Sequence, residues 1–451
     1  MRSLSFFSST HSFWLSISPP KPLNVALLMI RFHHGLRMCA AAVLLQIALA
    51  LPLVAVEKEI LQPIQTDYSV SDPQFRQSIN HLLGPPLVDG NKIKTLINGD
   101  EIFPAMLNAI RHAEKSITFE TYIWSKGKVG EEFAHAISER AMAGVKCHVI
   151  VDTLGSMKLP RKLINEMRAS GVRFVKYGHP NWWNFFFFLN HRDHRKILVV
   201  DGKVGFTGGV GIHDNWDGNA EAPPLWRDTH FKIEGPAVAQ LQGVFVDNWV
   251  RERNRVLQGS DYFPPMEPAG KSAVQCFRSG PRDGAENARL DYLMSIAAAR
   301  KSIRFEHAYF VPDKLITRAL VDACKRGVKI EVIIPGPTDS EITKVAGHIR
   351  WKELLRAGVK FYEYQQAQYH CKEMIVDDIW VTAGSVNLDH RSFRINAENN
   401  FNILDKDFAA EQIRIFEQDK AQSRLLTLKD LRWGFFGKIY ECFAGCFRSQ
   451  L

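Results

Sequence analysis

His194-Arg195-Lys196 opens a pattern that continues with Asp201 and Gly208-Gly209. The pattern returns later in the chain as His370-Cys371-Lys372, then Asp377 and Gly384-Ser385-Val386-Asn387. In both copies four residues separate the lysine from the aspartate, and six separate the aspartate from the first glycine. The copies lie 176 residues apart in matching surroundings, so they indicate one structural unit that occurs twice.

The repeat extends well beyond the two motifs. Residues 113–120 match 299–306, 144–146 match 327–329, and 171–174 match 358–361, in the same order. A chain of 451 residues is long enough for two domains, and this period is far too long for a solenoid. The sequence therefore predicts a duplicated unit.

Local patterns indicate that each unit alternates helices and strands. Phe103, Leu107 and Ile110 recur at helical spacing, and residues 116–124 form an apolar, β-branched and aromatic run typical of a strand. Further segments fit the alternation: a helix over 130–142 and strands over 147–151, 197–200 and 374–376. This order predicts an α/β fold whose sheet is covered on both faces.

We expect five segments along the chain. They are an N-terminal signal or membrane-anchor segment over 1–60, a first domain over 61–257, a linker over 258–271, a second domain over 272–425 and an amphipathic tail over 426–451. Three prolines between Tyr262 and Ala269 mark the linker.

Three segments point to a membrane. Residues 39–56 form an apolar run after two arginines, typical of a secretory signal or an uncleaved anchor, with a buried core helix as the alternative. Residues 182–188 contain six aromatic side chains in seven, which indicates either a loop at the lipid interface or a buried strand. Aromatic residues at helical spacing over 436–447 predict an amphipathic helix that packs on the body or docks at the interface.

Composition adds little about the ligand. Lysine and arginine number 57 against 48 acidic residues, so the net charge of +9 favours a polyanion or an anionic membrane surface and is also common in soluble proteins. Seven scattered cysteines show neither a disulfide framework nor paired metal-ligand spacing.

The paired motifs carry residues suited to phosphodiester exchange. That reaction needs a nucleophile, a proton donor for the leaving alkoxide, and cations around the phosphoryl oxygens. Histidine, with an ordinary pKa of about 6.5, can serve neutral in one copy and protonated in the other. Lys196 and Lys372 would supply positive charge, and lysine is not a metal ligand, so we expect no metal and no cofactor.

The doubled motif resembles the phospholipase D superfamily, over residues 90–425 or so. Four flanking phrases resemble its bacterial cardiolipin synthase branch: residues 190–196, 226–230, 309–313 and 387–396. The resemblance implies two duplicated phospholipase D-like α/β sandwich domains with the active site at their pseudo-twofold interface.

The resemblance also implies roles for individual residues. His194 would attack phosphorus to form a phosphatidyl-histidine, and His370 would protonate the departing glycerol and then deprotonate the incoming alcohol. The expected site comprises the catalytic motif residues His194, Lys196, Asp201, His370, Lys372 and Asp377, the substrate-binding residues Asn387, Ser385 and Gly209, and the histidine-orienting acids Asp228 and Glu398. For Asp201 and Asp377, support of the site is an equal alternative to a direct role. The first copy departs from the family by carrying Gly211 where the second has Asn387.

The sequence thus favours a phosphatidyl transferase that converts two phosphatidylglycerols to cardiolipin and glycerol. A phospholipase D hydrolase is the alternative, a nuclease is third, and a non-enzymatic membrane-binding module conflicts with two intact His–Lys motifs. The expected partners are an anionic phospholipid substrate and a membrane, with no nucleic acid and no obligate protein partner. The expected location is the bacterial inner membrane.

Overall fold

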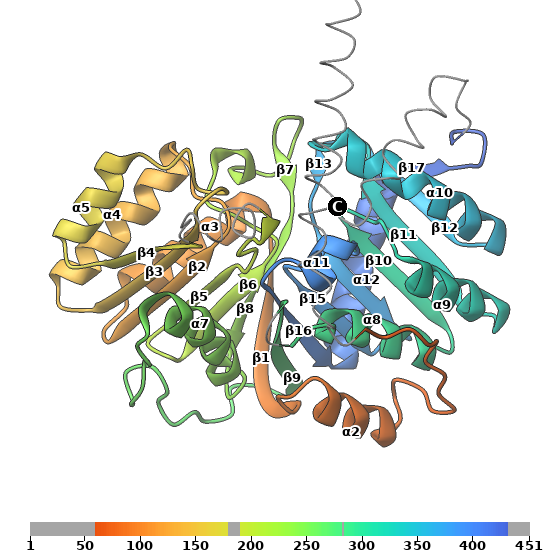
Figure 1. The fold of residues 1–451 in the computed structure, drawn as a ribbon, viewed down its shortest axis with the longest axis horizontal. Coiled ribbons are helices and arrows are strands. Elements are labelled where there is room, and N and C mark those ends of the chain that lie inside the picture. Colours follow the sequence, from red (N-terminus) through yellow and green to blue (C-terminus); the bar gives the residue numbers. More distant parts are fainter. Residues whose placement is uncertain (1–58, 179–189, 282–283, 432–451) are drawn as a thin grey trace, which may run out of the picture. The chain divides into compact units, whose positions relative to one another are not determined.

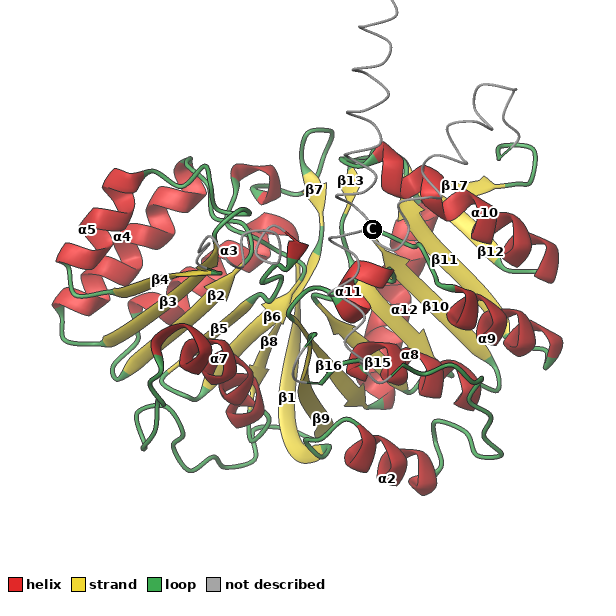
Figure 2. Ribbon diagram, viewed as in Figure 1, coloured by secondary structure: helices red, strands yellow, loops and turns green. Residues whose placement is uncertain are grey.

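One mixed sheet of 15 strands runs through the part of the chain that the computed structural model describes, residues 59–178, 190–281 and 284–431 (Figure 1). Its strand order is β17-β12-β11-β10-β14-β15-β16-β9-β1-β8-β6-β5-β2-β3-β4. Helices lie on both faces of the sheet (Figure 2). The prediction of a duplicated α/β fold is confirmed.

The first half of the sheet is built by elements from β1 to α7. They are β1 (Val88–Ile97), α3 (Asn98–Arg111), β2 (Ser116–Thr121), α4 (Lys128–Met142), β3 (Lys146–Asp152), α5 (Arg161–Ala169), β4 (Arg173–Tyr177), β5 (Ile197–Val200), β6 (Val204–Gly208), the short η2 (Asp214–Trp216) and β7 (Trp226–Arg227), β8 (Thr229–Glu234) and α7 (Val238–Arg253). The strand expected over 116–124 ends at Thr121, and Trp124 makes an isolated bridge to Ile212 instead.

The second half follows a similar order from β9 onward, with β13 ahead of the motif strand and β17 at the end as additional strands. Its elements are β9 (Ser272–Ser279), α8 (Asn287–Ala298), β10 (Ser302–His307), α9 (Lys314–Lys325), β11 (Lys329–Pro335), α10 (Glu341–Ala357), β12 (Lys360–Tyr364), β13 (Gln368–Tyr369), β14 (Lys372–Val376), β15 (Trp380–Gly384), α11 (His390–Arg394), β16 (Glu398–Leu404), α12 (Lys406–Ala421) and β17 (Ser423–Leu426).

Strand pairing repeats with the sequence. β2 pairs parallel with β3 and antiparallel with the motif strand β5, and β10 pairs in the same way with β11 and β14. The two halves join edge to edge because β1 and β9 pair antiparallel across a register shift. This joint makes one continuous sheet out of two repeats.

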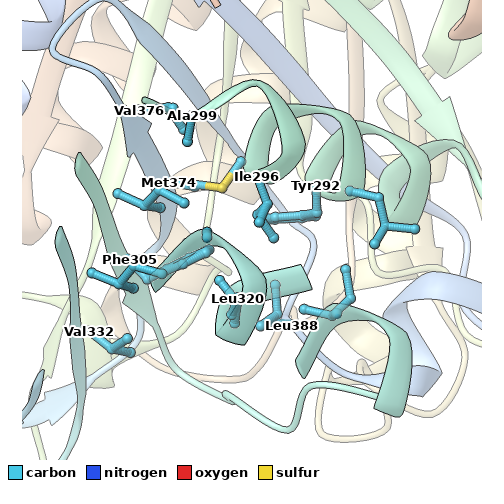
Figure 3. Close-up of a cluster of buried hydrophobic side chains, with 14 of the residues drawn as sticks. Tyr292, Ile296, Ala299, Phe305, Leu320, Val332, Met374, Val376 and Leu388 are labelled. Atoms are coloured by element: carbon cyan, nitrogen blue, oxygen red, sulfur yellow. The ribbon is translucent and has the colours of Figure 1, made fainter. Parts of the chain in front are cut away.

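Alternating side chains of the strands fill a core on each face, as period-two burial requires. On β5, Leu198 and Val200 pack in the cluster that contains α3 and α4, whereas Ile197 and Val199 pack in the cluster that contains α7. In the second half, Tyr292 and Ile296 of α8 lie over Phe305 and Met374 of the sheet (Figure 3).

Helix α2 (Pro73–Leu82) packs on the second half, although it lies in the segment expected to open the first domain. Residues from 61 onward were assigned to the first half, but Phe75 and Ile79 are buried in the cluster of the second half. The rings of Phe75 and Trp380 pack edge to face, with their centroids 4.9 Å apart. The apolar face of this helix gains burial against α8 and β15, so the segment belongs by packing to the second half.

The three segments expected to meet a membrane, 39–56, 182–188 and 436–447, lie outside the described residues. Of the helices that the structure describes, none combines the length and apolar character needed to cross a bilayer.

Candidate active site

A cavity of about 480 Å³ is lined by residues of both halves. His194 and Lys196 of the first motif and His370 of the second are among its lining residues, together with Asn387. The repeated motifs therefore meet at one site.

His194 lies just before β5 and is held at two points by the other half. Its backbone N–H donates to the carbonyl of Ala397 at 2.8 Å. The next residue, Glu398, begins β16 and contacts Nδ1 of the His194 ring at 2.8 and 3.0 Å. The acid that orients the first histidine thus comes from the second half.

His370 repeats this arrangement with the halves exchanged. Its backbone N–H donates to the carbonyl of Arg227 at 2.8 Å, and the next residue, Asp228, contacts Nδ1 of the His370 ring at 2.8 Å. Because a carboxylate accepts Nδ1–H, Nε2 of the His194 ring is left as the nitrogen for chemistry, whereas Nε2 of the His370 ring lies 3.2 Å from Lys372 Nζ.

Each carboxylate is completely buried and is held ionised by its donors. Burial opposes ionisation of Glu398, yet His194, Lys196 and a hydrogen bond from Ser385 together keep the pKa of this carboxyl below its usual value. For Asp228 burial has the same effect, and His370, Lys372 and the Trp216 indole N–H together lower its pKa. These contacts stabilise the Nδ1–H tautomer of both rings.

Burial also shifts the bases of the site. It lowers the pKa of His194 to about 4, with the neighbouring lysines adding to the shift and Glu398 opposing it. Burial lowers the pKa of His370, helped by Lys372 and opposed by Asp228. The free site therefore holds neutral imidazoles at neutral pH.

The two motif lysines are tethered in the same way. Lys196 Nζ donates to the carbonyl of His194 at 2.7 Å, and Lys372 Nζ donates to the carbonyl of His370 at 2.6 Å. Burial lowers the pKa of Lys196 to about 7, with Glu398 opposing the shift. Both lysines place their charge beside the histidine of their own motif.

The three expected phosphate-binding residues have different positions. Asn387 lines the cavity, and its buried amide oxygen has no protein partner among the described residues, so it is available to a substrate. Ser385 is fully buried behind Glu398, to which its hydroxyl donates at 2.5 Å. A Cβ at Gly209 would meet the Asp228 carboxylate at 2.2 Å. The structure therefore places Ser385 and Gly209 behind the acids, as their supports, rather than in the cavity.

Asp201 and Asp377 lie at the far ends of the motif strands, about 16 Å from the motif lysines along an extended chain. The Asp201 carboxylate accepts the backbone N–H groups of Glu114, Lys115 and Ser116. Asp377 accepts the equivalent groups of residues 300–302. Neither lines the cavity, and each ties its motif strand to the turn before β2 or β10, a geometry that favours the supporting role over the direct one.

Trp216 is a site residue that the sequence did not single out. Its indole Nε1–H donates to Asp228 Oδ2 at 2.9 Å and does for this acid what the Ser385 hydroxyl does for Glu398. The residue equivalent to Ser385 is a glycine, and nothing in the local sequence says that a tryptophan seven residues later replaces it.

Behind the second motif, Glu306, Cys371 and Asp419 bring three metal-ligating groups within 4.8 Å of one another. Asp419 is already paired with Arg227 at 2.8 Å and accepts the Tyr369 hydroxyl at 3.0 Å. Burial raises the pKa of Glu306 to about 8, despite the opposing charge of Arg227. The Arg227 guanidinium therefore neutralises Asp419 in this cluster, whereas one buried oxygen of Glu306 has no hydrogen-bond partner among the described residues.

Comparisons with known proteins agree with this geometry. The family model described as "Cardiolipin synthase, PLD-like domain" matches residues 106–249 and 292–420. "Cardiolipin synthase A" of Pseudomonas fluorescens is 34% identical over 352 residues, which cover 77% of this chain and 72% of that protein. "Cardiolipin synthase 1" of Bacillus anthracis is 31% identical over 396 residues, 84% and 77% of the two chains. The fold is similar to the crystal structure of phosphatidylserine synthase from Haemophilus influenzae Rd KW20, with a TM-score of 0.62 at 13% identity, covering 84% of this chain and all of that one.

Replacing Asp201 tests whether the motif aspartates support the fold. Asp201→Ala leaves three backbone N–H groups without their acceptor, so we expect the free energy of unfolding to fall by about 1–2 kcal/mol. Asp201→Asn keeps a side-chain oxygen as acceptor, and asparagine readily adopts the φ of +54° found at Asp201, so this variant should retain most of the stability. Denaturant titration measures both. A stable, folded Asp201→Ala protein without activity would instead give this residue a direct role.

Proposed function

This chain belongs to the cardiolipin synthase family of phospholipase D-like enzymes, and from that premise we propose that it joins two phosphatidylglycerols into cardiolipin and glycerol. The observation that carries the proposal is the pair of histidines, each held at Nδ1 by a carboxylate of the opposite half, around one cavity. Such a pair supplies a nucleophile and an acid–base on opposite sides of a single phosphodiester.

In the first step His194 Nε2 attacks the phosphorus of the donor lipid. Its lowered pKa leaves the ring neutral, and Glu398 holds the proton on Nδ1, so the Nε2 lone pair is free. The bond from phosphorus to the headgroup oxygen breaks, and that oxygen takes a proton from His370 Nε2. The products are a phosphatidyl-histidine and glycerol.

In the second step the same groups work in reverse. His370 takes the proton of an acceptor hydroxyl, the acceptor oxygen bonds to phosphorus, and the phosphorus–nitrogen bond to His194 breaks. Water in place of the lipid alcohol would give phosphatidic acid, which is the hydrolase alternative.

Cations of the chain neutralise the phosphoryl oxygens in both steps. Lys196 and Lys372 lie beside the expected phosphate position, where fixed donors stabilise developing charge, and Asn387 lines the same cavity. A bound phosphodiester also brings a negative charge next to His370, which favours the protonated form that the first step needs.

We place the enzyme at the bacterial inner membrane, because its substrates are bilayer lipids. The bacterial source of the relatives and the apolar run over 39–56 support this location. An anionic phospholipid is the partner, and the chemistry requires no nucleic acid and no second protein.

The decisive experiment is mass spectrometry of lipid products from purified protein and phosphatidylglycerol vesicles, with and without EDTA. We expect cardiolipin and free glycerol in both samples, because lysines rather than a metal carry the positive charge. Phosphatidic acid alone would identify a hydrolase. Turnover that EDTA abolishes and one divalent ion restores would contradict the proposed charge carriers.

Replacing each orienting acid by its amide distinguishes the role of His194 from the role of His370. Glu398→Gln should slow formation of the covalent adduct about 10²–10⁴-fold, because the ring of the nucleophile loses its Nδ1–H partner. Asp228→Asn makes the same change at His370, and should spare adduct formation from a p-nitrophenyl phosphodiester, whose leaving group needs no proton. Adduct formation is measured by peptide mass spectrometry after acid quench. Equal losses in both variants, or an adduct on His370, would reverse the assignment.

The pH dependence of adduct formation reports the lowered pKa of His194. A free histidine with a pKa of about 6.5 is only about 3% neutral at pH 5. With a pKa of about 4 the ring is mostly neutral at pH 5, so the nucleophile persists to lower pH. At limiting p-nitrophenyl substrate we expect the rate of adduct formation to fall less than about twofold between pH 7 and pH 5. A drop centred near pH 6.5 would show an unshifted nucleophile.

A further inference from the structure

The two ends of the cavity differ in charge. Beside His194, Tyr122 lies 5.1 Å from the histidine ring and within the electrostatic influence of Asp152, Arg192 and Arg391, of which the two arginines line the cavity. Beside His370, the ring of Tyr309 lies 6.4 Å away and its hydroxyl contacts the carboxylate of Asp339. The lining of the His194 end therefore includes two arginines, and the lining of the His370 end includes an acid.

Asp339 is held in place and remains accessible. It follows β11 and lines the cavity as an exposed residue. The Tyr309 hydroxyl lies 2.7 and 2.8 Å from its two oxygens, and Gln368 Nε2 donates to one of them at 3.2 Å. Gln368 stands two residues before His370, so the acid is fixed relative to the second histidine. A carboxylate has about four acceptor sites, and these two donors leave capacity for a ligand.

The first half lacks this pair. Asp339 lies ten residues after Lys329, the start of β11, and Ser156 lies ten residues after Lys146, the start of the matching strand β3. Ser156 is fully buried, where its hydroxyl bonds to the backbone. Ile123 takes the place of Tyr309 in the repeat. The acid therefore belongs to the His370 end alone.

A carboxylate in a cavity that must hold a phosphodiester repels the substrate charge. Its presence needs a compensating contact, and the chemistry that a carboxylate recognises without a cation is a hydroxyl donor. Asp389, the other lining acid near this end, is committed to capping α11 through the Ser392 N–H at 2.8 Å. Asp339 caps no helix in the described residues.

We propose that Asp339, held by Tyr309 and Gln368, accepts hydrogen bonds from the vicinal hydroxyls of a glycerol headgroup at the His370 end. This inference rests on the proposed function, in which the departing oxygen faces His370. Because the acceptor alcohol returns along the path by which the first glycerol left, the same subsite binds the glycerol of the second lipid. Asp339 thus selects the donor headgroup and favours a lipid alcohol over water.

This contact changes neither the bonds that form and break in the second step nor the proton that is transferred. The acceptor hydroxyl that reacts gives its proton to His370, its oxygen bonds to phosphorus, and the bond to His194 breaks. Asp339 binds the neighbouring hydroxyl, keeps its own protonation state, and positions the reacting oxygen.

The test compares Asp339→Asn with wild type on two donor lipids, phosphatidylglycerol and phosphatidylethanol, which lacks the hydroxyls. We expect the ratio of kcat/KM for the two donors to fall by about 10-fold or more, the range of a hydrogen bond to a charged group. With phosphatidylglycerol alone, the ratio of cardiolipin to phosphatidic acid should fall as well. Tyr309→Phe, which removes one holding contact and keeps the ring, should lower both ratios by less.

Asp322→Asn is the matched control. It makes the same charge change on α9, where Asp322 pairs with Lys325, and should leave both ratios at the wild-type value. If Asp339→Asn keeps both ratios, whatever happens to its overall rate, the proposal is wrong. If wild type converts phosphatidylglycerol only to phosphatidic acid, the proposed transfer fails while the donor ratio still decides the role of Asp339. If wild type leaves phosphatidylglycerol unchanged, both proposals fall.

Discussion

A carboxylate of each half bound to Nδ1 of the other half's histidine is the interaction on which the site depends. The residue before each acid accepts the backbone N–H of the same histidine, so Ala397-Glu398 and Arg227-Asp228 fix both the main chain and the ring of their partners. Neither half has a complete site, because each histidine would lose its orienting acid. The continuous sheet through β1 and β9 holds the two halves in the register that these contacts need.

Burial makes these contacts effective. The histidines, lysines and acids of the site are almost fully removed from solvent, where an uncompensated charge costs several kcal/mol. The lysines donate to carbonyls and are stabilised by the charge of the buried acids, and the histidines respond by becoming neutral. The same desolvation that opposes charge in the free site strengthens every contact to a phosphodiester that enters it.

The two halves are copies of one unit, and they differ in the residues that hold the orienting acids and line the cavity. The Ser385 hydroxyl binds Glu398, whereas the Trp216 indole binds Asp228. Asn387 lines the cavity, whereas a Cβ at the equivalent Gly211 would lie only 3.1 Å from Ile123. Trp216 lies 3.2 Å from that same Cβ position, so the ring that supports Asp228 occupies the space of the missing side chain. The glycine of the first motif thus lies against the tryptophan that holds the Asp228 carboxylate.

The sequence by itself determined the duplication, the α/β alternation and the histidines and lysines of the motifs, because these depend on spacing and periodicity within each repeat. It named Asp228 and Glu398 through resemblance, but only the tertiary structure decided that each acid serves the opposite half, since that contact joins residues 142 and 204 positions apart. Only the packing shows that α2 lies against the second half and that Ser385 and Gly209 lie behind the acids. It also shows that Asp201 and Asp377 bind the backbone of a turn remote from the cavity. The spacing within a motif shows which residues lie on the same strand. The strands and helices that pack beside that strand decide which way each side chain faces.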